Sequence, residues 1–250
     1  MVDDLFGISK CGPESIALNS FINQEIEMKK LQFHTSNEKG KSKCHKLHVG
    51  KKCKECPNLK VHGKDMVEVQ SHTYLGDEIS NNGKNTENIK SRVSKGIGIV
   101  TDILNILKTI QNGHHYFETA VLLRDSMLIN GILTNAEAWH NVTKNDVKEL
   151  GKVDKMFFGK LLEAPFSTPS ESFYLEFGIL PVWSIIKGRR INFLKYLVDR
   201  NQESMLGKVF KVQWIDPDPG DCSYLVTKDL EDLDIDLTLG SNKRYAQDKI

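Results

Sequence analysis

Hydrophobic positions recur with two different periods along this chain, and the change of period divides it. Over residues 44–49, 59–61, 66–69 and 74–80, apolar and polar residues alternate or form short apolar runs, which predicts short β-strands. From Thr86 onward the spacing becomes three to four residues, which is typical of amphipathic helices. One helix is also expected in the first part, over residues 15–30.

Five helices are predicted in the second part. The first begins near Thr86 and runs for about seven turns, with an apolar stripe formed by Ile89, Val93, Ile97, Val100, Leu104 and Leu107. The others are expected over residues 116–133, 146–162, 170–177 and 182–199. Proline residues interrupt the pattern between them, at Pro165, Pro169 and Pro181. Large aromatic residues of amphipathic helices usually lie in the core, so we expect burial of Trp139, Trp183 and Phe193.

The predicted fold class is therefore α+β: a small antiparallel sheet carrying one helix, followed by an all-α helical bundle. A strand beginning at Tyr74 should end in a turn at Asn81-Asn82-Gly83, because Asn-Gly pairs accept left-handed backbone. Three regions follow from this pattern. They are residues 1–83, the sheet; residues 84–200, the bundle; and residues 201–250, an acidic segment that is helical or loosely ordered.

Composition allows a folded protein with a substantial core, since 39% of the 250 residues are apolar and the net charge is only +1. No apolar run approaches the ~18 residues that a bilayer span needs, so no membrane partner is expected. Five unevenly spaced cysteines indicate a reducing compartment rather than a disulfide framework. We expect an intracellular protein, cytoplasmic or nuclear, and the sequence leaves its oligomeric state open.

The small net charge conceals two blocks of opposite sign. Residues 39–64 contain nine lysines and a single acidic residue, Glu55, whereas residues 216–236 contain eight acidic residues and one lysine. A basic block of this kind can bind phosphates through counterion release, or it can be an ordinary solvated loop. The charge pattern leaves both possibilities open.

Several segments, taken in order, resemble the C-terminal part of a non-LTR (LINE-type) retrotransposon reverse transcriptase. Val2-Asp3-Asp4-Leu5 is similar to the Asp-Asp turn of the palm, residues 38–43 resemble the following lysine-rich motif, and Tyr74-Leu75-Gly76 resembles the primer grip. Residues 130–133, 137–139, 174–181 and 189–194 resemble the thumb and post-thumb helices. The resemblance covers roughly residues 1–210 and implies a partial palm followed by a thumb.

The resemblance also implies roles for individual residues. Asp3 and Asp4 would be catalytic ligands of Mg²⁺ in two-metal nucleotidyl transfer, and the triphosphate would be contacted by Lys39, Lys41 and Lys43. An RNA template and a DNA primer would be the partners. Their backbones would contact the primer grip, formed by Tyr74, Leu75 and Gly76, and the first thumb helix, through Lys90, Arg92 and Lys95.

Departures from the family pattern bear on catalysis. Met1 stands where the family has Tyr or Phe, which suggests a reading frame that starts at an internal methionine. In that family, another metal-binding aspartate of the palm comes from sequence upstream of this point. The nucleotide-binding fingers also come from upstream. We therefore expect the fragment to lack stand-alone polymerase activity, with Asp3 and Asp4 either weak Mg²⁺ ligands or a solvated turn.

Two alternatives to a polymerase fragment remain. The basic block could form a non-catalytic nucleic-acid-binding module, with or without a Zn²⁺ site. The candidate ligands for such a site are Cys44, His45, His48, Cys53 and Cys56, for example the set Cys44, His48, Cys53 and Cys56. Against such a site, Cys44 and His48 would lie about 13 Å apart on a regular strand, at about 3.3 Å per residue. Alternatively, the helical bundle could serve as an interaction surface after the loss of an ancestral activity.

Overall fold

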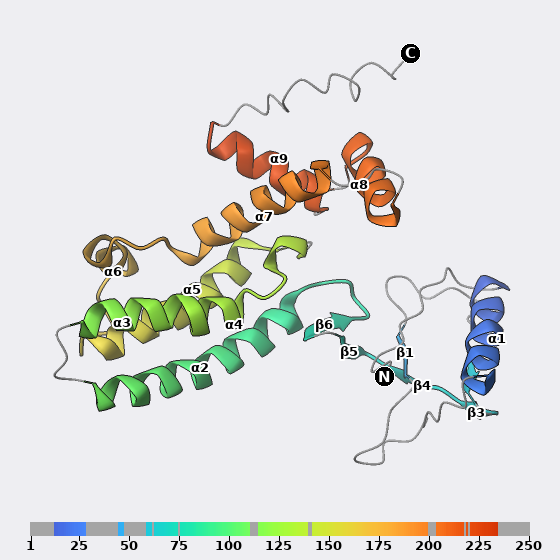
Figure 1. Cartoon of the computed structure of the whole chain (residues 1–250), viewed down its shortest axis with the longest axis horizontal. Coiled ribbons are helices and arrows are strands. Elements are labelled where there is room, and N and C mark those ends of the chain that lie inside the picture. Colours follow the sequence, from blue (N-terminus) through green and yellow to red (C-terminus); the bar gives the residue numbers. More distant parts are fainter. Residues whose placement is uncertain are drawn as a thin grey trace. The chain divides into compact units, whose positions relative to one another are not determined.

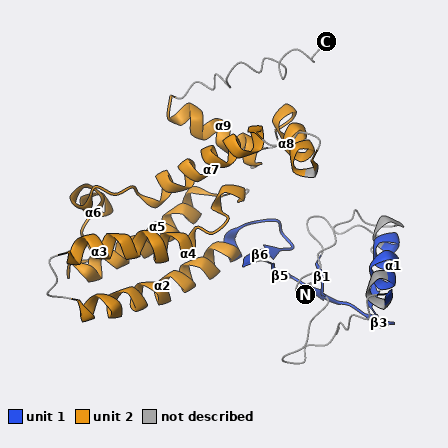
Figure 2. Cartoon of the chain, viewed as in Figure 1, with its two compact units in different colours: residues 1–87 blue, residues 88–250 orange. Residues whose placement is uncertain are grey.

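The computed structural model describes residues 13–28, 45–47, 59–61, 63–74, 76–110, 115–139, 142–199, 204–217, 219 and 221–234. These residues form an α+β fold in which helices predominate (Figure 1). The chain divides into two compact units, residues 1–87 and residues 88–250 (Figure 2). This division lies close to the change of hydrophobic period near residue 84.

The described residues of unit 1 form one helix and three separate pairs of short strands. The helix is α1 (Pro13–Met28), and the strands are β1 (His45–Leu47), β2 (Lys60–Val61), β3 (Lys64–Asp65), β4 (Val67–Val69), β5 (Ser71–Tyr74) and β6 (Asp77–Ser80). Strands β2 and β3 pair antiparallel, as do β5 and β6, but β1 and β4 pair parallel. The expectation of one antiparallel sheet is therefore wrong for the described residues.

Glycines in left-handed conformation explain why these strands stay short. Gly63 has φ +74° between β2 and β3, and Gly76 has φ +85° between β5 and β6. Each glycine reverses the chain, so the expected strand over residues 74–80 is instead the end of one strand, a two-residue turn and β6. The predicted turn after residue 80 is confirmed, with Gly83 at φ +64° and its amide donating to the carbonyl of Ser80 at 3.1 Å.

Unit 2 consists of helices, and most of their predicted bounds are confirmed within two residues. They are α2 (Thr86–Thr109), α3 (Tyr116–Leu123), a π-helical segment (Arg124–Ile129), α4 (Asn130–Ile132), a 3₁₀ turn (Ala136–Ala138), α5 (Lys144–Leu161), α6 (Ser170–Phe177) and α7 (Val182–Asp199). Helix α5 begins with a capping box in which Thr143 and Asp146 exchange hydrogen bonds. The π-helical segment joins α3 and α4 into the single helix that the sequence predicted.

The main core of unit 2 lies among α2, α4, α5, α6 and α7. Helix α2 turns most of the predicted stripe toward it: five of the six residues are buried or pack against the core, and only Ile97 is exposed, at 46%. Arg92 and Gly96 are buried beside them, which the polarity of the sequence did not reveal. Trp139 is buried as expected, but Trp183 is 50% exposed with the ammonium of Lys187 over its ring.

Two further helices, α8 (Met205–Ile215) and α9 (Cys222–Asp232), occupy the predicted acidic segment. They pack against α7 in a small second core that includes Leu194, Val226 and Leu230. Ion pairs reinforce this contact, since Arg190 binds Asp229 at 2.8 Å and Lys187 binds Asp232 at 2.6 Å. Among the described residues, no helix combines the length and apolar character needed to cross a bilayer.

Helix α2 approaches the rest of the bundle most closely at Gly96. A Cβ atom there would lie 2.7 Å from Cγ2 of Ile132 and 2.9 Å from Cγ1 of Val153. We therefore expect Gly96→Ala to lower the free energy of unfolding by about 1–2 kcal/mol, since overpacking outweighs the gain in helix propensity. Urea unfolding followed by circular dichroism measures this change.

Gly98→Ala is the matched control, because a Cβ at Gly98 meets nothing within 4 Å. It should raise the free energy of unfolding by about 0.5–1 kcal/mol through helix propensity alone. Equal stability of the two variants would contradict the close packing of α2 at Gly96.

Candidate nucleic-acid interface

Most of the predicted palm residues lie outside the described residues. This applies to Asp3, Asp4, Lys39, Lys41, Lys43 and Leu75, and also to the proposed zinc ligands Cys44, His48, Cys53 and Cys56. Their predicted roles therefore stay predictions. The described candidates are Tyr74 and Gly76 in unit 1 and Lys90, Arg92 and Lys95 in unit 2.

Tyr74 and Gly76 lie at the tip of the β5–β6 hairpin. Tyr74 is the last residue of β5 and is paired with Asp77 of β6, while Ser71 donates a 2.6 Å hydrogen bond to the Glu78 carboxylate farther along the hairpin. Gly76 is exposed, and its positive φ is what the tight turn requires. The turn alone accounts for a glycine here, and a Cβ would meet nothing within 4 Å.

Helix α2 has a solvent face built from small polar residues. Its exposed positions spaced by three and four residues are Ser91, Ser94, Gly98, Thr101 and Asn105. Lys90 and Lys95 are exposed at the two sides of this face, as the sequence predicted. Together they form what we call the α2 face, on which the carboxylates of Glu87 and Asp102 are exposed as well. The sequence reasoning identified the lysines but missed the small residues between them.

Arg92 does not belong to this face, and its predicted placement on the helix surface is wrong. It is 4% exposed, and its Nη1 donates to the carbonyl of Gly131 at 3.2 Å. Arg189 of α7 binds the same helix end, with Nη1 donating to the Leu133 carbonyl at 2.6 Å and Nη2 to Oδ1 of Asn130 at 2.6 Å. The last carbonyls of a helix lack partners within it and carry partial negative charge, so both arginines act as caps of α4.

A buried ion pair lies at the centre of unit 2. Arg124 is 1% exposed and makes two parallel bonds to Asp154, at 2.9 Å through Nε and 2.7 Å through Nη2. Nη2 also donates to the carbonyl of Leu180 at 3.0 Å, and the guanidinium lies 5.8 Å from the centre of the Phe158 ring. Burial raises the pKa of the Asp154 carboxyl, and the hydrogen bonds from Arg124 oppose that shift.

Tyr174 of α6 lies beside this cluster, close enough for its hydroxyl to interact with Asp154. Burial, together with the negative charge of Asp154, raises the pKa of Tyr174 to about 12. The cluster joins the π-helical segment, α5, α6 and the residues before α7. Because it is enclosed and its hydrogen bonds are directed at one another, we interpret it as structural rather than catalytic.

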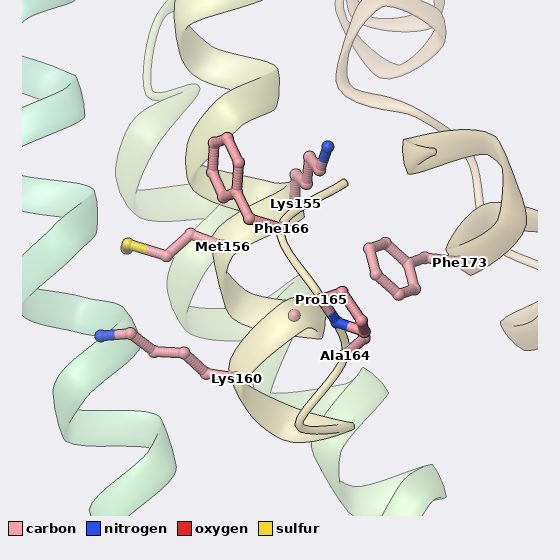
Figure 3. A pocket seen from close by; sticks show the side chains of 8 residues that line it. Lys155, Met156, Lys160, Ala164, Pro165, Phe166 and Phe173 are labelled. Carbon is pink, nitrogen blue, oxygen red and sulfur yellow. The ribbon is translucent and has the colours of Figure 1, made fainter. Parts of the chain in front are cut away.

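A shallow pocket of about 210 Å³ lies where α5 ends (Figure 3). Its lining includes Lys155, Met156, Lys160, Phe166 and Phe173. Figure 3 shows the side chains of Lys155 and Phe166 next to each other, whereas Lys160 lies apart from them. The Lys155 ammonium lies 5.0 Å from the centre of the Phe166 ring. This pocket was not predicted from the sequence. The aromatic residue directly after Pro165, in a segment between two helices, was the feature that indicated it.

Two histidines meet in unit 1, on β1 and β5. Nδ1 of His45 lies 3.3 Å from Nδ1 of His72, and the rings are perpendicular to within a few degrees, at 87°. Within the ranges that the structure describes, no group of three or more His, Cys, Asp or Glu side chains converges as metal ligands would. The histidine pair could therefore supply two nitrogen ligands to a metal ion.

Comparisons of the chain with protein-family models, with curated proteins and with solved structures give no match. The function has to be inferred from the side chains and from the resemblance described above. In unit 2 these leave two exposed surfaces with suitable chemistry, the α2 face and the pocket at the end of α5.

The buried cluster makes stability sensitive to alkaline pH. Tyr174→Phe removes the half-buried hydroxyl that interacts with Asp154 and should lower the free energy of unfolding at pH 7 by about 1–2 kcal/mol. In the folded protein Tyr174 keeps its proton up to a pKa of about 12, whereas in the unfolded chain it loses the proton near pH 10. The stabilising effect of Tyr174 should therefore be fully present below pH 10 and disappear as the pH rises toward 12.

Urea unfolding of the wild type and of Tyr174→Phe at pH 7, 9, 10 and 11 measures this effect. The stability difference should stay constant to about pH 9 and narrow above pH 10. Tyr224→Phe, at a tyrosine that is 40% exposed on α9, serves as the control and should change little at any pH. A difference that widens above pH 10 would refute the assignment.

Proposed function

We propose that this chain is the C-terminal part of a reverse transcriptase of the non-LTR retrotransposon type, and that unit 2 is its thumb. In this proposal the thumb holds the duplex of RNA template and DNA primer through the sugar-phosphate backbone. Asp3 and Asp4 belong to the catalytic centre of the complete enzyme, where Mg²⁺ ions stabilise the attacking and leaving oxygens. The described residues contribute binding rather than chemistry.

The α2 face is the observation that carries this proposal. Ser91 and Ser94 have short side chains and Gly98 has none, so a double helix can approach closely, and the two serine hydroxyls can donate hydrogen bonds to phosphate or sugar oxygens. Lys90 and Lys95 add positive charge on either side of them. Such contacts hold a duplex without reading its sequence, which a polymerase must do because its template changes at every step.

Contacts between the segments that resemble the family support the proposal as well. Asn130 and Leu133 lie in one such segment, and both are bound by Arg189 of another. Leu180, in a third segment, accepts a hydrogen bond from Arg124 of the buried cluster at 3.0 Å. Residues far apart in the sequence that carry the resemblance thus form joint packing contacts in unit 2, as expected if they define one structural unit.

Replacing both lysines of the α2 face tests duplex binding. Lys90→Ala with Lys95→Ala should weaken binding of an RNA–DNA hybrid duplex and reduce the slope of log affinity against log salt by up to about 2, one for each lost phosphate contact. Fluorescence anisotropy of a labelled 20-base-pair hybrid, at salt concentrations from 50 to 300 mM, measures both quantities with the full chain.

Lys195→Ala is the control, since Lys195 is exposed on α7 rather than on α2. It should leave the slope unchanged. Ser94→Leu places a bulky side chain in the middle of the α2 face and should weaken duplex binding without lowering stability. If the wild type does not bind the hybrid, or if the double variant binds with unchanged slope, the proposal is rejected.

A second candidate function is a zinc-dependent nucleic-acid-binding module, and the histidine pair of unit 1 favours it. Zinc binds imidazole nitrogen at about 2.0–2.1 Å in tetrahedral geometry, which places two nitrogen ligands about 3.3 Å apart. The Nδ1 atoms of His45 and His72 have that separation, 3.3 Å. His45 belongs to the cluster that the sequence offers for Zn²⁺, whereas His72 does not, so the pair adds a candidate ligand to the zinc hypothesis.

Metal analysis of untagged protein tests this candidate. Stoichiometric zinc in the full chain, released more readily by a chelator after His45→Ala or His72→Ala, is the expected result if the two imidazoles are ligands. His115→Ala is the control, because His115 lies in unit 2. Zinc-free protein with unchanged nucleic-acid affinity would exclude the metal-dependent module, and a simple hydrogen bond between the rings would then explain their distance.

A further inference from the structure

The loop after α5 presents an aromatic side chain to solvent. Helix α5 ends at Leu161, Glu163 adopts a left-handed φ of +50°, and the amide of Ala164 donates back to the Gly159 carbonyl at 2.9 Å. This C-cap reverses the chain. A turn follows, closed by a 3.0 Å hydrogen bond from the Thr168 amide to the carbonyl of Pro165. Phe166 lies at its tip and is 89% exposed.

Such exposure is unusual for an aromatic side chain next to a core in which other aromatic rings are buried. Phe157, Phe158 and Phe173 are all buried within the same part of unit 2. Phe166 instead forms the rim of the 210 Å³ pocket, opposite the apolar surface of Phe173 and Met156 (Figure 3). The Lys155 ammonium contacts the ring, and the high exposure leaves the remainder of the ring available to a ligand.

A row of lysines leads along α5 to this pocket. Lys148, Lys152 and Lys155 are spaced by four and three residues on the side of α5 opposite the buried Leu150, Val153, Asp154, Phe157 and Phe158. The row spans seven residues, or about 10 Å of helix. Lys152 is paired with Glu149 at 2.6 Å, but no described carboxylate lies within ion-pair distance of Lys148 or Lys155.

Two glycines keep the surface beside this row low. A Cβ at Gly151 or at Gly159 would meet nothing within 4 Å, and Gly159 forms part of the pocket lining. A helix that only needed a solvated face would gain about 1 kcal/mol from alanine at each of these positions. Because glycine has no side chain, the backbone of a ligand can approach the helix closely at these two positions.

We infer that the end of α5 binds single-stranded nucleic acid: one base stacks on Phe166 over the pocket, and the adjoining phosphates follow Lys155, Lys152 and Lys148. Base-on-aromatic stacking combined with a basic track is the physical basis of sequence-tolerant single-strand binding. The pocket is smaller than the ~300–1,000 Å³ of typical small-molecule sites, so it accepts one ring rather than a whole ligand. This inference rests on the proposed function for the class of partner but concerns a surface separate from the α2 face.

The test measures single-strand and duplex binding in parallel with the full chain. Fluorescence anisotropy with a labelled 12-nucleotide RNA, a DNA of the same sequence and the 20-base-pair hybrid is carried out for each variant. Phe166→Ala should weaken single-strand binding by about tenfold, within the range measured for loss of one stacked base, and leave duplex binding unchanged. Phe166→Trp should restore it, which loss of a purely structural contact would not predict.

Two further variants separate stacking from charge. Lys148→Ala with Lys155→Ala should reduce the salt slope of single-strand binding by up to about 1.4, because the slope per contact is about 0.7 for single strands. Leu175→Ala, at an exposed apolar residue of α6 outside the pocket lining, is the control and should change nothing.

The outcomes distinguish this inference from the proposed function. Single-strand binding that Phe166→Ala leaves unchanged overturns the inference, even if the lysines of the α2 face still govern duplex binding. Loss of single-strand affinity in Phe166→Ala with no measurable duplex binding supports the inference and rejects the thumb proposal. Absence of binding to all three probes overturns both.

Discussion

The buried pair of Arg124 and Asp154 is the interaction on which unit 2 depends. Both side chains are at most 1% exposed, and removing either one would leave a charge without its partner in the interior. Such a loss typically costs about 3–5 kcal/mol, a large part of the stability of an ordinary domain. The geometry that this pair requires, with two parallel bonds and a third to the Leu180 carbonyl, fixes α5, the π-helical segment and the start of α7 relative to one another.

Arginine and lysine have different tasks in this protein. The four arginines of the described residues, Arg92, Arg124, Arg189 and Arg190, all bond to carbonyls, carboxylates or an amide oxygen of unit 2 itself. The planar guanidinium suits this use because several of its donors can be satisfied at once in a fixed geometry. Lysines divide between two tasks: Lys187 of α7 pairs with Asp229 and Asp232, whereas the lysines of α2 and most of those on α5 are exposed. In the proposed function the exposed lysines bind the polyanion, and their flexible stem suits contacts that need not be sequence-specific.

Hydrophobic periodicity predicted the helices of unit 2 well, because each of them buries one apolar side against a shared core. The α6 and α7 bounds were predicted to the residue, since prolines mark where both helices begin.

The orientation of α2 was predicted less well. Arg92 and Gly96 face inward because of groups outside their own helix, namely the carbonyl of Gly131 and the side chains of Ile132 and Val153. The strands of unit 1 were recognised as strands, but their partners depend on turns at Gly63 and Gly76 that alternation does not reveal. Of the candidate site, Lys90 and Lys95 came from the sequence, whereas the pocket arises from a helix cap and a turn that only the fold brings together.

The close packing at Gly96 connects the two proposed surfaces. Since Gly96 lies against Val153 of α5, the buried sides of α2 and α5 face one core. The small polar residues of α2 and the lysine row of α5 are both directed to solvent.

The two proposed surfaces differ in chemistry in a way that matches a template partly paired with its primer. A duplex presents only backbone to a protein that ignores sequence, which suits a smooth helix with flanking cations. An unpaired strand also exposes the faces of its bases, and an aromatic ring beside a basic track is what can bind them. A single helical unit with both surfaces could thus hold a junction between paired and unpaired nucleic acid.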